Sequence, residues 1–279
     1  DPARSLNYLG ALLLSMGQYE AARPYYEQAL AIRRKVLGEE HPDTANSLNN
    51  LGALLLAMGQ YEAARPYYEQ ALAINRKVLG EEHPDTASSL NNLGVLLKSM
   101  GQYEAARPYF EQALAIRRKV LGEAHPDKAS SLNNLGSLFQ DLGQYEGSRL
   151  YYEQALAIRR KVLGEEHPDT ASSLNNLGGL LDSMGQYEAA RPYYEQALAI
   201  NRKVLGEEHP ITATSLNNLG SLLLDMEQYE AARPYYEQAL AIFQKTLGVD
   251  HPNTKIVQNN LDTLLKKIAG LPDNEDKTT

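Results

Sequence analysis

Residues 43–84 read DTANSLNNLGALLLAMGQYEAARPYYEQALAINRKVLGEEHP, and residues 169–210 repeat this stretch with four differences. Each of the six histidines in the chain is followed by proline, and successive His-Pro pairs are 42 residues apart. A fixed period of this length is typical of a repeat array in which each unit is one supersecondary element. We therefore predict six copies of one unit, with bounds at about 1–42, 43–84, 85–126, 127–168, 169–210 and 211–252.

The first half of the unit has the apolar spacing of a helix. Apolar residues recur there at three- and four-residue steps: Leu48, Leu51, Leu55 and Met58. This spacing predicts a helix, here called helix A, from about Thr44 to Met58. Its start is indicated by Pro42 and by Asp43, whose carboxylate can accept hydrogen bonds from the first free backbone N–H groups, and Gly59 is expected to end it.

The second half of the unit predicts another helix, helix B. Its apolar stripe comprises Tyr61, Ala64, Tyr68, Ala71, Leu72, Val78 and Leu79. We expect helix B to run from Tyr61 to about Leu79 and to bend at Pro66, because proline lacks a backbone donor and crowds the preceding turn. The fourth repeat replaces this proline with Leu150 and an Ala-Ala pair with Gly147 and Ser148. Its helix B is expected to be straighter but intrinsically weaker.

One pair of helices cannot cover its own apolar stripe, so neighbouring pairs must stack. The predicted fold is an all-α solenoid of antiparallel helix pairs, forming a single domain over residues 1–269. Residues 253–269 repeat helix A with Gln258 and Asp262 at positions that are leucine and glycine in the other repeats, which predicts a polar capping helix. Residues 270–279 are expected to form a disordered tail.

Composition argues against several function classes. The chain has no cysteine, which excludes disulfides, thiolate catalysis and cysteine-bound zinc, and fits a reducing, cytoplasmic setting. Its net charge of −8 is dispersed, with no basic cluster that would favour nucleic acid. No apolar run is long enough to span a bilayer, so we predict no membrane association.

Repetition also argues against an active site. Translation along an array produces rows of like side chains, whereas catalysis needs unlike groups that converge at one point. Equivalent histidines in stacked repeats lie one or two helix spacings of about 8–10 Å apart, too far to share a zinc ion that needs ligands at about 2.1 Å. We therefore predict no enzyme activity, no metal and no cofactor.

Two sets of residues indicate the family. The order Leu48, Leu51-Gly52, Leu55, Gly59, Tyr61, Ala64, Tyr68, Ala71 resembles the tetratricopeptide repeat pattern. The unit exceeds the usual length of about 34 residues, and the stretches 83–87, 90–93 and 67–72 are similar to kinesin light chain repeats. This resemblance implies a right-handed superhelix whose helices A line a concave, peptide-binding groove. It also implies, by analogy, a sensor segment of a larger signalling protein.

Paired asparagines follow a leucine of helix A in every repeat after the first. They are Asn49 and Asn50, Asn91 and Asn92, Asn133 and Asn134, Asn175 and Asn176, and Asn217 and Asn218, with a further pair at Asn259 and Asn260. A side-chain amide both donates and accepts hydrogen bonds, so it can pair with the main chain of an extended ligand. Alternatively, one asparagine of each pair bridges neighbouring repeats. We expect at least one of each pair to contact the ligand.

Specificity is expected where the copies differ. One helix A position reads Leu14, Leu56, Lys98, Gln140, Asp182 and Leu224, and the next reads Ser15, Ala57, Ser99, Asp141, Ser183 and Asp225. The change from apolar to acidic fits a ligand with an apolar end and a basic end, although drift after duplication explains it equally well. Lys98, Gln140, Asp141 and Asp182 join the asparagines as candidate groove residues. The predicted function is a protein- or peptide-binding scaffold or sensor, and the alternative is a structural spacer or a self-associating or designed array without a specific ligand.

Overall fold

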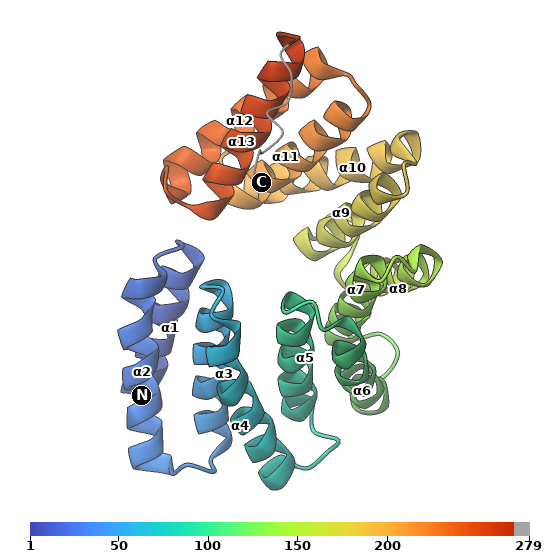
Figure 1. The fold of residues 1–279 in the computed structure, drawn as a ribbon. Helices are drawn as coiled ribbons and strands as arrows, with labels where there is room; N and C mark the ends of the chain where they lie inside the picture. The colour runs from blue at the N-terminus through green and yellow to red at the C-terminus, as the bar shows by residue number, and fades with distance from the viewer. Residues whose placement is uncertain (271–279) are drawn as a thin grey trace, which may run out of the picture. The chain divides into compact units, whose positions relative to one another are not determined.

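The computed structural model describes residues 1–270, and this part of the chain consists of thirteen α-helices (Figure 1). Helix A of the six repeats is α1 (Pro2–Ser15), α3 (Pro42–Ala57), α5 (Pro84–Ser99), α7 (Pro126–Asp141), α9 (Pro168–Ser183) and α11 (Pro210–Asp225). Helix B is α2 (Tyr19–Leu37), α4 (Tyr61–Leu79), α6 (Tyr103–Leu121), α8 (Tyr145–Leu163), α10 (Tyr187–Leu205) and α12 (Tyr229–Leu247). The last helix is α13 (Pro252–Ile268). The predicted all-α fold of six helix pairs and a capping helix is confirmed.

The chain divides into two compact units, Asp1–Ala155 and Leu156–Thr279, with the boundary inside α8. In the first unit, α1 packs on α2, α3 on α4 and α5 on α6, and successive pairs stack through α2 and α3, α4 and α5, and α6 and α7. In the second unit, α9 packs on α10, α11 packs on α12, and the stack continues from α10 to α11 and from α12 to α13. Each unit thus buries an apolar core that neighbouring helix pairs share.

Each helix A after the first begins at the proline of a His-Pro pair, with the histidine as its N-cap. In α3, Pro42 occupies the first helical position, and His41 Nδ1 accepts a hydrogen bond from Asp43 N at 3.1 Å. The prediction that Asp43 caps this helix is therefore wrong, as is the predicted start at Thr44. Proline fits the first helical position because its fixed φ suits a helix and its missing N–H has no intrahelical partner there. The capping residue therefore lies before the proline.

A contact between glycine and an aromatic ring sets how closely helix A approaches helix B. The glycines are Gly10, Gly52, Gly94, Gly136, Gly178 and Gly220, and the rings facing them are those of Tyr26, Tyr68, Phe110, Tyr152, Tyr194 and Tyr236. A Cβ atom at Gly52 would lie 2.7 Å from Tyr68 Cε1, closer than carbon atoms pack. Glycine thus lets the ring pack directly against the helix A backbone.

The range of helix B and the capping helix at the end of the array agree with the sequence prediction. The α4 helix continues without interruption through Pro66, over the predicted range. In α13, Val257, Leu261 and Leu264 are buried in the core that α12 and α13 share, while Gln258 Nε2 donates to Asp262 Oδ1 at 2.9 Å on the outer face. This arrangement is that of a capping helix. The predicted tail, apart from Gly270, lies outside the described residues.

Candidate ligand-binding face on helix A

Some of the paired asparagines join neighbouring helices A. Asn134 Nδ2 donates to Asn91 Oδ1 at 2.6 Å, linking α7 to α5. Asn260 Nδ2 donates to Asn217 Oδ1 at 2.9 Å, linking α13 to α11. In both cases the first asparagine of one pair meets the second asparagine of the next. Bridging between repeats, the alternative left open by the sequence, therefore occurs at these positions.

In two other repeats, the first asparagine of the pair forms a hydrogen bond with a serine of the next helix A. Asn49 Nδ2 donates to Ser89 Oγ at 3.3 Å, and Asn175 Nδ2 donates to Ser215 Oγ at 3.4 Å. Both serines are completely buried. Asn133, the first asparagine of the fourth repeat, is itself buried at 8% exposure. The first position of the pair thus lies toward the next repeat.

Four of the second asparagines are more available than the first asparagines. Asn50, Asn92, Asn176 and Asn218 are half-buried on helix A. Within residues 1–270, none of these four side chains makes a hydrogen bond to another group of the chain. Their amides therefore keep their donors and acceptors for water or a ligand.

In the first unit, two oppositely charged side chains at the variable positions form an ion pair. Lys98 Nζ lies 2.8 Å from Asp141 Oδ2, an ion pair that joins α5 to α7. Beside it, Tyr152 Oη donates to Gln140 Oε1 at 3.3 Å. The structure thus brings these three predicted site residues together, with their charges already paired.

In the second unit, the variable positions hold two aspartates without a basic partner among its described residues. Asp182 of α9 and Asp225 of α11 interact electrostatically, and neither has a basic partner among the described residues of this unit. The Oδ1 atom of Asp182 is buried without a hydrogen bond there. Burial, with a smaller contribution from Asp225, raises the pKa of Asp182 to about 6. Burial also raises the pKa of Asp225. The site therefore carries carboxylates whose charge the protein does not compensate.

Comparison with known proteins identifies the family of this fold. The tetratricopeptide repeat family matches residues 1–77, 53–119, 85–161, 127–203, 183–245 and 212–266. The chain belongs to the tetratricopeptide repeat family. Proteins of this family are generally protein-interaction scaffolds. No curated protein matches the sequence.

Solved structures place the tetratricopeptide array beside kinesin light chain-like proteins. A Podosopora anserina protein assigned as a kinesin light chain, with nearly identical TPR-like repeats, is 33% identical with a TM-score of 0.60, and the match covers 74% of this chain and 98% of that one. BtubC (BKLC) from P. vanneervenii is 20% identical with a TM-score of 0.59, covering 100% and 97% of the two chains. A Rap protein complexed with Competence and Sporulation Factor is 17% identical with a TM-score of 0.67, covering 96% and 76%. The last two show likeness of fold.

One set of polar residues in the tetratricopeptide array was missed by the sequence analysis. A buried helix B position holds Arg33, Asn75, Arg117, Arg159 and Asn201 in successive repeats. Arg117 Nη1 donates to the backbone oxygen of Asp127 at 3.1 Å and to Ser131 Oγ at 2.7 Å. Burial lowers the pKa of Arg117. These residues join helix B to the next helix A, and their signal in the sequence is a polar side chain on an otherwise apolar stripe.

Other kinds of site find no support in the described part of the array. Residues 1–270 contain no group of three or more histidine, aspartate or glutamate side chains placed to hold a metal ion. Over the same residues, no helix is long and apolar enough to cross a membrane.

Proposed function

We propose that this tetratricopeptide array binds an extended peptide or protein segment along its helix A face. The observation that supports this proposal is two sets of second asparagines, Asn50 and Asn92 in the first unit and Asn176 and Asn218 in the second, whose half-buried amides have no partner in residues 1–270. An amide that both donates and accepts can pair with the N–H and C=O groups of any main chain. Contact of this kind gives affinity without demanding a particular ligand sequence.

The charges along this face favour a ligand with a basic end. In the first unit, Asp141 already neutralises Lys98. In the second unit, Asp182 and Asp225 lack a cation, and a lysine or arginine of the ligand would supply one. A partly buried carboxylate is costly unless it is paired, so a basic group gains more there than at an exposed acid.

A structural neighbour supports ligand binding by this kind of fold. The Rap structure was determined as a complex with Competence and Sporulation Factor. We therefore propose a sensor or adaptor role in which a captured segment is the signal. The ligand proposed for the second unit is a polypeptide segment that carries basic residues.

Peptide titration tests this function. Fluorescence anisotropy with a library of labelled peptides, half of them lysine-rich at one end, should find saturable binding. The double variant Asn176→Ala and Asn218→Ala, with both changes in the second unit, should weaken it about tenfold, the effect of two lost hydrogen bonds at about 0.7 kcal/mol each. The matched control is Asn46→Ser, because Ser172 occupies the equivalent position in the fifth repeat.

The outcomes separate binding from a passive role. Unchanged affinity in Asn46→Ser, with retained helicity in all variants, is expected. If no peptide binds saturably, or if the double variant binds like the wild type, the proposed function is wrong. In that case light scattering over a range of protein concentrations would show whether the array associates with itself.

A further inference from the structure

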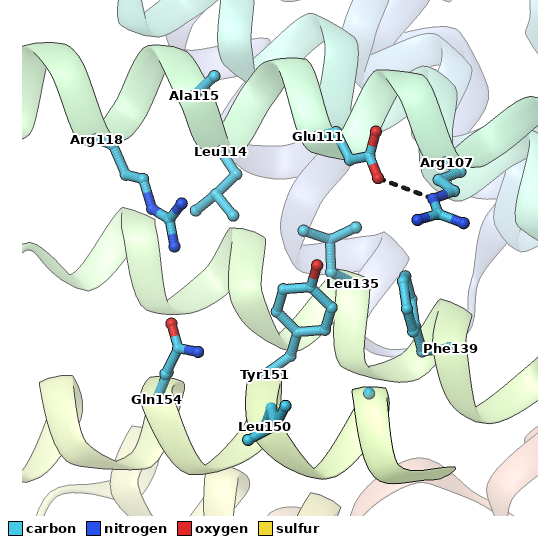
Figure 2. Close-up of a pocket in the computed structure, with 11 residues that line it drawn as sticks. Arg107, Glu111, Leu114, Ala115, Arg118, Leu135, Phe139, Leu150, Tyr151 and Gln154 are labelled. Carbon is cyan, nitrogen blue, oxygen red and sulfur yellow. Dashed lines mark hydrogen bonds and ion pairs between the residues drawn. The ribbon is translucent and has the colours of Figure 1, made fainter. Parts of the chain in front are cut away.

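A second candidate surface lies on the helix B side of the first unit. A pocket of about 620 Å³ lies between α6 and α8, and residues of α7 also line it. Figure 2 shows the side chains that surround it. Its floor is apolar and includes Leu114, Leu135 and Phe139. Leu150 lies at its edge and is 61% exposed. A large exposed apolar side chain beside an apolar cavity is typical of a contact surface.

The pocket is lined by the residues that make the fourth repeat irregular. Phe139 stands where the second repeat has Leu55, and Gly147 stands where it has Ala63. A Cβ atom at Gly147 would lie 2.5 Å from Phe139 Cδ1, so the larger ring depends on the smaller residue facing it. Leu150 replaces a proline. These changes together place an aromatic ring and a leucine where other repeats have smaller or stiffer side chains.

The basic residue at one end of the pocket is Arg118. Arginines at the same helix B position elsewhere each form an ion pair with a loop glutamate: Arg34 with Glu39 at 2.8 Å, Arg76 with Glu81 at 3.0 Å, Arg160 with Glu165 at 2.9 Å and Arg202 with Glu207 at 2.9 Å. Each also donates to a glutamine of the next helix B, as Arg76 does to Gln112 at 3.3 Å. Among the described residues, Arg118 makes neither contact.

A substitution on α7 explains why Arg118 is left without its usual partner. The corresponding loop glutamate, Glu123, instead forms an ion pair with Lys128. Lys128 is 4% exposed and replaces a threonine, represented by Thr86, whose Oγ1 donates to the backbone oxygen of Gly80 at 2.7 Å. Because Glu123 pairs with Lys128, it forms no ion pair with Arg118, although the charge of Arg118 still helps to lower the pKa of Glu123.

The geometry of Arg118 makes its guanidinium available to a ligand. Arg118 is exposed, whereas its counterpart Arg76 is half-buried. In Figure 2 the Arg118 guanidinium points into the pocket, toward Gln154 on α8. The charges at the other end of the pocket are already paired, since Arg107 Nε lies 2.8 Å from Glu111 Oε1. The pocket therefore combines an apolar floor with a guanidinium that, within residues 1–270, forms no ion pair.

We propose that this pocket docks a segment of a partner protein that carries an aromatic or leucine side chain next to a carboxylate. The apolar side chain would pack on Leu135 and Phe139, and the carboxylate would pair with Arg118. Arginine suits this role because its planar guanidinium can hold a carboxylate through two parallel hydrogen bonds. This surface is separate from the helix A face, so the array would hold two segments at once.

Two peptides of matched shape test the pocket. The first is the acetylated, amidated tetrapeptide Asp-Phe-Asp-Leu, and the second is its uncharged counterpart Asn-Phe-Asn-Leu. Isothermal titration calorimetry with the full chain should show one acidic peptide bound per chain and at least about fivefold weaker binding of the uncharged one. Equal affinity for both peptides, or no saturable heat, would overturn the proposal.

Three variants assign the binding to Arg118. Arg118→Gln should weaken binding of the acidic peptide at least about fivefold. Lys128→Thr should weaken it as well, although residue 128 lies outside the pocket, because Glu123 becomes free to pair with Arg118. Arg76→Gln, the same change one repeat earlier, should leave binding unaltered.

The variant results also exclude a merely structural effect. Arg118 is exposed, so circular dichroism of Arg118→Gln should match that of the wild type. If folded Arg118→Gln or folded Lys128→Thr binds the acidic peptide as the wild type does, the pocket is not the docking site. Weakening by Arg76→Gln would point to a different interface and would likewise overturn the proposal.

Discussion

Replacing Gly136 with alanine tests how closely the two helices of the fourth repeat pack. A Cβ atom at position 136 would lie 2.6 Å from Tyr152 Cδ1 and 2.7 Å from its Cε1. Carbon atoms in favourable contact are about 3.5–4.0 Å apart. Tyr152 is only 3% exposed, so the surrounding side chains hold its ring in place. The ring or the helix must therefore shift by about 1 Å.

Two opposing terms set the size of the effect of Gly136→Ala. Overpacking a well-filled site costs about 1–3 kcal/mol. Alanine favours the helix over glycine by about 0.8–1.0 kcal/mol. We expect the overpacking term to dominate, with a net loss of about 1–2 kcal/mol in the free energy of unfolding. Gly136→Leu should lower stability further, because its side chain is larger.

Urea denaturation followed by far-ultraviolet circular dichroism measures this loss as a lower midpoint at an unchanged slope. The control is Gly179→Ala, where the new Cβ would meet only Tyr194 Oη at 3.3 Å and where the second repeat already has Ala53. This control should leave the midpoint unchanged or raise it. A Gly136→Ala midpoint at or above that of the wild type would refute the close packing.

Three further predictions concern charge, buried polar contacts and helix caps. Asp182→Asn should stabilise the protein more at about pH 7.5 than at about pH 5. Burial, with a smaller contribution from Asp225, raises the pKa of Asp182 to about 6, so the stabilising effect of the protonated carboxyl is complete below its unfolded pKa and is lost as the pH rises through about 6. Because the side chain is partly exposed, we expect a difference of about 1 kcal/mol, and equal thermal shifts at both pH values would contradict it. Arg117→Ala should lower the free energy of unfolding by about 1–3 kcal/mol, because buried acceptors lose their donor. Arg117→Asn, which copies Asn75, should lower it less. Equal urea midpoints for the two variants would be evidence against this prediction. His83→Ala should lower the free energy of unfolding by about 0.5–2 kcal/mol, because α5 loses its N-cap. A urea midpoint equal to that of the wild type would show that the cap does not contribute to stability.

The fold could be predicted from sequence because period and helical spacing are both local signals. The 42-residue interval between His-Pro pairs fixed the repeats, and the apolar stripes fixed two helices in each. The cap was assigned to Asp43 instead of His41 because aspartate is a common cap and histidine is not. Only the position of Pro42 in the first turn distinguishes them.

The site was only partly predictable, because its residues act across repeats. Asn91 and Asn92 are the same residue type at adjacent positions, and spacing within one helix does not separate their roles. The hydrogen bond from Asn134 to Asn91 spans 43 residues, one more than the repeat, and this offset arises from the stacking of neighbouring helices. The availability of Arg118 likewise follows from an exchange of partners at Lys128 that no single stretch of sequence reveals.

The contacts that join the repeats have a consequence for how such an array can change its length. Each joint has a donor on one helix B, such as Arg117, and acceptors on the next helix A, such as Ser131. Both halves of the joint are encoded within each of the first five 42-residue copies, whereas the sixth has Phe243 at the donor position. Unequal duplication therefore adds a complete joint together with each new repeat, and no compensating substitution is needed. An array built in this way can lengthen or shorten its ligand-facing surface in whole units, while a locally altered repeat such as the fourth remains distinct.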